Sequence, residues 1–201
     1  MFGDPYSVAH DGPEFTRLLD LAETAPDEVA RMVAAGVKAG DPVAAQSIVA
    51  LAAEGKAPDG AVALLRGVAP GAAGTFQIRV AQALHVLTGD DSWADPLVSF
   101  LASGAWKGIR LDAAIALADF PPTPRLIEAL GQAVRDPEYL VRYHAANTLL
   151  RYAGHDTGIA EHPEVFAKIA RTADGDATAA DQAGWDEAAD LLTADALRRL
   201  D

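Results

Sequence analysis

The chain has 201 residues, a formal net charge of −13 and no cysteine. The absence of cysteine excludes disulfide scaffolds, thiolate metal sites and cysteine nucleophiles. The negative net charge argues against a surface that binds DNA or RNA, because phosphate binding needs a cationic face. No apolar run approaches the roughly 18 residues of a membrane span and the N-terminus lacks the features of a signal peptide, so we expect a cytoplasmic protein with no membrane association and no nucleic-acid partner.

Almost every segment of the chain is predicted to be helical. Alternating strand patterns are missing, and breakers cut the sequence into helices of about three turns each. In chain order, the expected helices cover residues 12–24, 26–39, 41–54, 58–68, 75–88, 93–102, 107–119, 123–134, 137–153, 163–172 and 177–200. After the first helix they pair into five hairpins, and a turn is expected at residues 174–176 inside the last one.

The expected helix ends follow from local chemistry. Proline is tolerated in a first helical turn, because the N–H groups there have no partner within the helix. Four prolines are expected in such turns: Pro26, Pro58, Pro96 and Pro163. Asp41 and Asp95 are predicted to cap their helices, and Gly89 and Gly154 are predicted to end helices in a left-handed conformation.

A ten-residue phrase recurs along the chain. It reads IRVAQALHVL from residue 78, IRLDAAIALA from residue 109 and VRYHAANTLL from residue 141, and its arginines, Arg79, Arg110 and Arg142, are 31 and then 32 residues apart. Such a period is typical of stacked helix pairs, because one pair cannot bury its apolar face alone. We predict an all-α, right-handed α-solenoid of about five hairpins plus an N-terminal helix, with the best repeats at residues 58–154.

The whole chain, residues 1–201, is predicted to form a single repeat domain. Its terminal hairpins, residues 12–55 and 161–201, lack the Val-Arg or Ile-Arg pair and are interpreted as atypical capping hairpins.

The repeat resembles the HEAT-repeat family, and within it the short HEAT-like repeats found in phycobilisome-lyase-type proteins. Residues 126–150, LIEALGQAVRDPEYLVRYHAANTLL, match the family's unit of a leucine-rich helix, a turn aspartate and VRxxAAxxL. The resemblance implies a structural ladder in which Asp136 and Arg142 support each other. The turns before Arg79 and Arg110 lack the aspartate, so these two arginines are expected to bond to turn carbonyls. A basic ladder that binds an anionic ligand is the alternative.

One face of the last repeated helix is the best candidate for a binding surface. Tyr143, Asn147 and Arg151 recur every four residues, and His144 lies beside them. Asn147 is the only asparagine in the chain and has low helix propensity, while tyrosine and arginine are favoured at interfaces. An ordinary solvated face is the alternative.

Two further residues are assigned to the same binding surface. His85 and Asp112 fall on the preceding second helices, which line the concave face in the resembled family. With His144 they resemble a metal facial triad in content, but solvent-facing polar residues on a helix are the preferred interpretation. A second polar group lies in one loop, where helix capping is the alternative to a metal site: His155, Asp156, Glu161 and His162. We predict no metal and no cofactor.

The three tryptophans, Trp93, Trp106 and Trp185, have two interpretations. They serve either as exposed anchors for a partner or as packing at hairpin ends.

We expect a non-catalytic adaptor or scaffold that binds a protein or peptide on its concave face, as a monomer or weak dimer. No catalytic residue is predicted, because neither a nucleophile elbow nor a phosphate-binding loop is visible. Two alternatives remain. One is an enzyme or lyase-type subunit with a small molecule or metal in the groove. The other is an acidic immunity protein that inhibits a basic toxin, whose binding salt would weaken.

Overall fold

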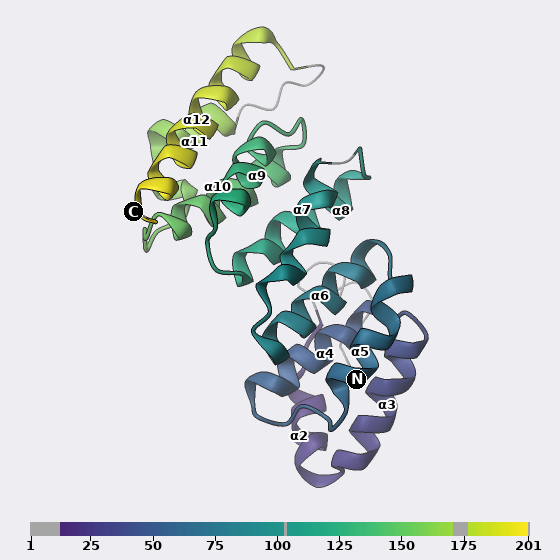
Figure 1. Ribbon diagram of the computed structural model, residues 1–201. Coiled ribbons are helices and arrows are strands. Elements are labelled where there is room, and N and C mark those ends of the chain that lie inside the picture. The colour runs from purple at the N-terminus through teal and green to yellow at the C-terminus, as the bar shows by residue number, and fades with distance from the viewer. Residues whose placement is uncertain (1–12, 103, 171–176, 201) are drawn as a thin grey trace. The chain divides into compact units, whose positions relative to one another are not determined.

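The computed structural model describes residues 13–102, 104–170 and 177–200. These residues form helices joined by turns and loops, with no strand among them (Figure 1), which confirms the all-α prediction for this part of the chain. The chain divides into two compact units, Met1–Trp93 and Ala94–Asp201, and each is described by itself. The right-handed solenoid and the single repeat domain stay predictions.

The first unit is built around α4. Its described helices are α2 (Thr16–Thr24), α3 (Pro26–Lys38), α4 (Pro42–Ala53), α5 (Ala61–Val68) and α6 (Gly74–Thr88). Helix α4 packs against α3 and α6. Val33, Ile48 and Leu84 come from these three helices and are buried together in one core. Burying such side chains is the main source of stability for a helix pair in water.

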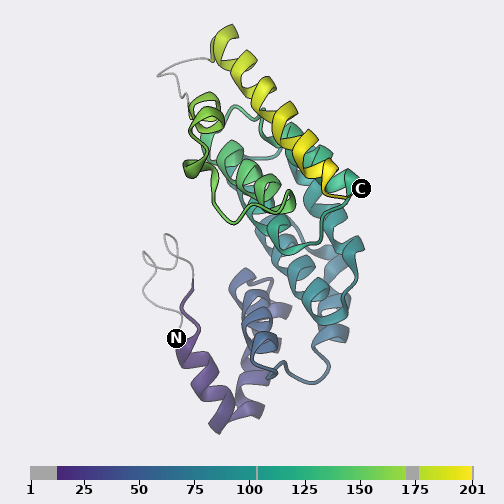
Figure 2. The same cartoon turned by 90° about the vertical axis from the view of Figure 1, so that its left-hand side faces the viewer.

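The second unit is built around α9 and α10. Its described helices are α7 (Ala94–Ala102), α8 (Lys107–Ala116), α9 (Pro124–Ala133), α10 (Tyr139–Tyr152), α11 (Pro163–Ile169) and α12 (Ala179–Arg198). Helix α10 packs against α8, α9 and α12, and α12 lies beside α11 (Figure 2). The predicted buried stripe of α10, Val141, Ala145 and Leu149, is confirmed, because none of the three is more than 1% exposed.

Several predicted helix ends are confirmed. The Asp41 carboxylate accepts a hydrogen bond of 2.9 Å from the Val43 N–H, so Asp41 caps α4. Gly89 and Gly154 have φ values of +67° and +84°, the left-handed conformation that glycine adopts without strain. Pro26 and Pro163 stand at the first positions of α3 and α11.

Other predicted ends differ in the structure. Helix α5 begins at Ala61 and not at Pro58, because Gly60 turns the chain with a φ of +76° just before the helix. Asp95 lies inside the first turn of α7, like Pro96, and its carboxylate pairs with the Arg125 guanidinium instead of capping the helix. The predicted helix start at residue 12, the predicted end at residue 172 and the predicted turn at residues 174–176 lie outside the described residues.

The contact between α9 and α12 leaves no room for a side chain at Gly131. A Cβ atom added there would lie 2.3 Å from the Thr193 hydroxyl oxygen. We expect Gly131→Ala to lower the free energy of unfolding by about 2 kcal/mol, because overpacking outweighs the better helix propensity of alanine. Chemical denaturation followed by circular dichroism measures this loss.

Two control variants make the measurement specific. Adding Thr193→Ala to Gly131→Ala should restore most of the stability, because the clashing oxygen is gone. Gly67 in α5 has open space around it, so Gly67→Ala should raise stability by about 0.5–1 kcal/mol. Unchanged stability of Gly131→Ala alone would contradict the expected clash.

Candidate functional site

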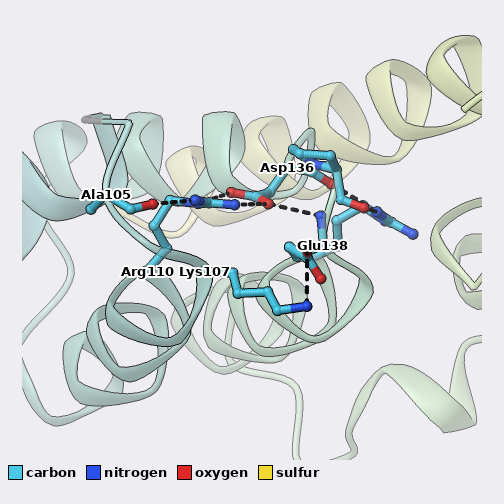
Figure 3. A network of polar contacts seen from close by, with 7 residues as sticks. Ala105, Lys107, Arg110, Asp136 and Glu138 are labelled. Carbon is cyan, nitrogen blue, oxygen red and sulfur yellow. Dashed lines mark hydrogen bonds and ion pairs between the residues drawn. The ribbon is translucent and has the colours of Figure 1, made fainter. Parts of the chain in front are cut away.

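A polar junction joins α8 to the turn that precedes α10. The Arg110 guanidinium on α8 donates two parallel hydrogen bonds to the Asp136 carboxylate, with Nε–Oδ2 and Nη2–Oδ1 distances of 2.7 and 2.9 Å. Arg110 also donates to the backbone carbonyl of Ala105 (Figure 3). Asp136 in turn accepts from the Glu138 N–H at 2.8 Å, which orients its carboxylate before α10 begins. Hydrogen bonding to Asp136 raises the pKa of Arg110.

Arg142, the next arginine of the repeat, is fully buried. Its Nη1 donates to the backbone carbonyls of Asp136 and Pro137 at 2.7 and 2.9 Å, and its Nε donates to the Ile169 carbonyl at 3.1 Å. Its guanidinium carbon lies 3.9 Å from the ring centroid of Trp185 on α12. Burial lowers the pKa of Arg142, and the charge of Asp136 opposes this shift. Asp136 therefore connects the two arginines: its carboxylate accepts from Arg110, and its backbone carbonyl accepts from Arg142.

Two of the predicted residues lie in the first unit, on α6. Arg79 donates to the Gln82 side-chain oxygen at 2.8 Å on the same helix. The His85 side chain is 14% exposed, and its Nδ1 lies 3.3 Å from a carboxylate oxygen of Asp91. The structure thus gives both residues local partners within the first unit.

The other predicted binding residues lie in the second unit, mostly along the outer face of α10. Tyr143 and His144 are half-buried and pack edge to face, with ring centroids 5.4 Å apart, and Arg151 is exposed. Burial lowers the pKa of His144, which favours the neutral imidazole at neutral pH. Asp112 is half-buried on α8, which packs against α10.

Asn147 has a structural partner that sequence reasoning missed. Its side-chain oxygen accepts a hydrogen bond of 2.7 Å from the Ile159 N–H, which ties the loop after α10 back to the helix. An asparagine in mid-helix indicates that its side chain has a specific partner, and this is confirmed here. The sequence does not show that the partner is a backbone group twelve residues further on.

Sequence reasoning also missed Leu140, at the apolar end of the α10 face, although it names Trp106 as a candidate anchor. Leu140, three residues before Tyr143, is 51% exposed, and Trp106 at the start of α8 is 70% exposed. The two border a depression of about 260 Å³, which we call the tryptophan depression. It is lined by Trp106, Lys107, Gly108, Leu111, Glu138, Leu140 and Val141. We call the outer face of α10 the α10 stripe: Leu140, Tyr143, His144, Asn147 and Arg151.

The ring of the exposed tryptophan lies over Gly108. A Cβ atom on Gly108 would lie 2.0 Å from the Trp106 ring, so a larger residue at this position would displace the ring. Beside the tryptophan ring, the Lys107 ammonium and the Glu138 carboxylate form an ion pair, with the two groups 3.5 Å apart (Figure 3). Of the three tryptophans, Trp106 has the exposure of an anchor, whereas Trp185 is only 3% exposed and packs on Arg142.

The loop after α10 has its own contacts. His155 Nε2 lies 2.7 Å from the Asp195 carboxylate on α12, and His162 Nε2 lies 3.1 Å from the Thr157 hydroxyl. Bonding to His155 lowers the pKa of Asp195. Within the described part of the chain, no group of three or more histidine and acidic side chains is arranged to hold a metal ion. In the same part, no helix is long and apolar enough to cross a membrane.

Comparison of the chain with family models, with curated proteins and with solved structures finds no match. The resemblance to HEAT repeats therefore stays a prediction.

Proposed function

We propose that the protein is a non-catalytic adaptor or scaffold that binds a protein or peptide through the tryptophan depression and the α10 stripe. The observation that carries this proposal is the 70% exposure of Trp106 beside the 51% exposure of Leu140. Exposed apolar side chains that gather around a depression mark interaction sites, and tryptophan, tyrosine and arginine dominate binding energy at interfaces.

The arrangement around these side chains suits an interface. Lys107 and Glu138 provide a polar rim, and their side chains are 58% and 41% exposed. Tyr143 and Arg151 extend the surface along α10. An apolar centre with a polar rim is the usual anatomy of a binding surface.

The surface is also held rigid. Its two helices, α8 and α10, pack against each other, and the Arg110–Asp136 pair joins α8 to the turn before α10. Rigid presentation reduces the conformational entropy lost on binding and so favours affinity.

Affinity capture tests this function. Tagged protein is incubated with lysate of the source organism, and the captured proteins are identified by mass spectrometry. Trp106→Ala and Leu140→Ala should each lose a specific protein that the wild type captures, because truncating an interface anchor weakens binding by roughly tenfold or more.

A matched control exists in the same unit. Leu191 on α12 is 50% exposed and lies outside the proposed surface, so Leu191→Ala should capture the same protein as the wild type. Circular dichroism confirms that all variants are folded. Equal capture by wild type, Trp106→Ala and Leu140→Ala would refute this location of the site, and no specific capture at all would refute the adaptor function.

A further inference from the structure

Three hydrogen-bond donors lie along the α10 stripe without an acceptor among the described residues. They are the Tyr143 hydroxyl, the Asn147 amide nitrogen and the Arg151 guanidinium, which recur every four residues. The printed contacts of these side chains are the ring contacts of Tyr143 and one hydrogen bond to the Asn147 oxygen. None of the three donors is a buried polar atom, so each is open to water. We call them the donor line.

The bond between Asn147 and Ile159 decides which end of the amide is left to donate. The Asn147 side-chain oxygen accepts from the Ile159 N–H at 2.7 Å. The loop comes close at Gly158, where a Cβ atom would lie 3.0 Å from the same oxygen. The oxygen is therefore held toward the loop, and the two N–H groups of the amide remain available for a ligand.

The spacing of the donor line fits an extended peptide. Four residues of α-helix rise about 6 Å, so Asn147 lies about 6 Å along the axis from Tyr143 and from Arg151. In an extended chain, every second residue presents its carbonyl to the same side, at intervals of about 6.6 Å. A peptide that runs along α10 in extended form therefore places an acceptor opposite each donor.

The charges of the stripe favour a carboxylate at the Arg151 end. Residues 143–151 include no acid, although the chain has a formal net charge of −13. Arg151 is exposed, and a guanidinium pairs with a carboxylate in bidentate geometry. The net charge of the protein disfavours a strongly acidic partner. The ligand that fits both conditions carries one carboxylate in an otherwise uncharged or basic segment.

We propose that the α10 stripe binds an extended peptide segment of a partner protein through its backbone carbonyls, with one carboxylate of that segment paired to Arg151. This inference rests on the proposed function and names the chemistry of the partner. Tyr143 and Asn147 donate to the peptide backbone, which contributes affinity whatever the peptide's side chains are. Arg151 selects the acid and sets the direction in which the peptide runs.

Peptide selection followed by titration tests the proposal. A random peptide library displayed on phage is selected on the full-length protein, and the enriched peptides are synthesised with a fluorescent label. Fluorescence polarisation then measures their affinity. We expect the enriched sequences to carry an aspartate or a glutamate, and replacing that acid with its amide should weaken binding by roughly tenfold.

Three variants of similar size each remove one part of the donor line. Tyr143→Phe deletes the hydroxyl and keeps the ring that packs on His144. Asn147→Asp keeps an acceptor for the Ile159 N–H and replaces the amide nitrogen with an oxygen. Arg151→Gln removes the charge. Tyr143→Phe should weaken peptide binding by roughly fivefold, and the other two variants by roughly tenfold or more.

Arg125→Gln is the matched control. The Arg125 side chain is 61% exposed and lies on α9, outside the stripe, so this variant should bind the selected peptides like the wild type. Circular dichroism confirms that all four variants are folded.

Three results would overturn the inference: no peptide is enriched, the enriched peptides carry no acid, or Asn147→Asp and Arg151→Gln bind them as tightly as the wild type. Failure of the inference is distinct from failure of the proposed function. A protein captured from lysate in a Trp106-dependent way, and captured equally by Asn147→Asp and Arg151→Gln, would refute the inference and keep the adaptor.

Discussion

Replacing Arg142 with alanine is expected to lower the free energy of unfolding of the second unit by about 4 kcal/mol. The guanidinium is fully buried and donates to three backbone carbonyls, those of Asp136, Pro137 and Ile169. In the alanine variant the three carbonyls lose their hydrogen-bond donor in a buried place that water does not reach. The variant also leaves a cavity beside the Trp185 ring. One side chain thus connects the start of α10 with the end of α11 and with α12.

Urea denaturation, followed by circular dichroism and by tryptophan fluorescence, measures the loss. Arg142→Lys keeps the charge but not the planar fork, so we expect it to lose about 2 kcal/mol. Arg125→Ala is the control, because Arg125 is 61% exposed in its pair with Asp95, and such surface pairs contribute less than about 1 kcal/mol. Equal stability of Arg142→Ala and Arg125→Ala would show that the buried arginine does not hold the helices together.

Asp136→Ala is expected to lower stability by about 3 kcal/mol, the second-largest effect. The Asp136 side chain is 9% exposed and the Arg110 side chain 14%, so removing the carboxylate leaves a guanidinium that is largely shielded from water without its partner. The same change removes the acceptor of the Glu138 N–H at the start of α10. Both losses fall on the junction that joins α8 to α10.

A double-mutant cycle separates the two contributions. Arg110→Ala and Asp136→Ala are measured singly and together by urea denaturation, and the coupling energy should be about 2 kcal/mol. Asp136→Asn should be less harmful than Asp136→Ala, because the amide oxygen still accepts from a backbone N–H. A coupling energy near zero would mean that Arg110 and Asp136 stabilise the unit independently, contrary to their bidentate geometry.

The helices and most of their ends could be predicted because their causes are local. Asp41 caps the helix that follows it, and Gly89 adopts a left-handed conformation that ends the helix before it. The spacing of Val141, Ala145 and Leu149 is enough to predict that these three side chains are buried. The predicted helix start at Pro58 was wrong, because the next residues, Asp59 and Gly60, form a turn and α5 begins at Ala61. Aspartate and glycine favour such a turn as much as proline favours a first helical turn.

The candidate site was less accessible to sequence reasoning. Tyr143 and Arg151 were identified by type and spacing, and the structure leaves them at least partly exposed on one helix. Asn147 was singled out correctly as unusual, but its side chain bonds to Ile159 within the chain. Leu140 was passed over, because an apolar residue in an amphipathic helix is expected inside.

The amino-acid sequence by itself determined the helical class and the order of the helices, because hydrophobic periodicity, helix propensity and capping act over a few residues. Only the tertiary structure decided that Asp136 joins Arg110 to Arg142, and that Trp106 is exposed while Trp185 is buried. Exposure and pairing depend on which surfaces the neighbouring helices cover. That is set by packing between segments tens of residues apart, which local chemistry does not encode.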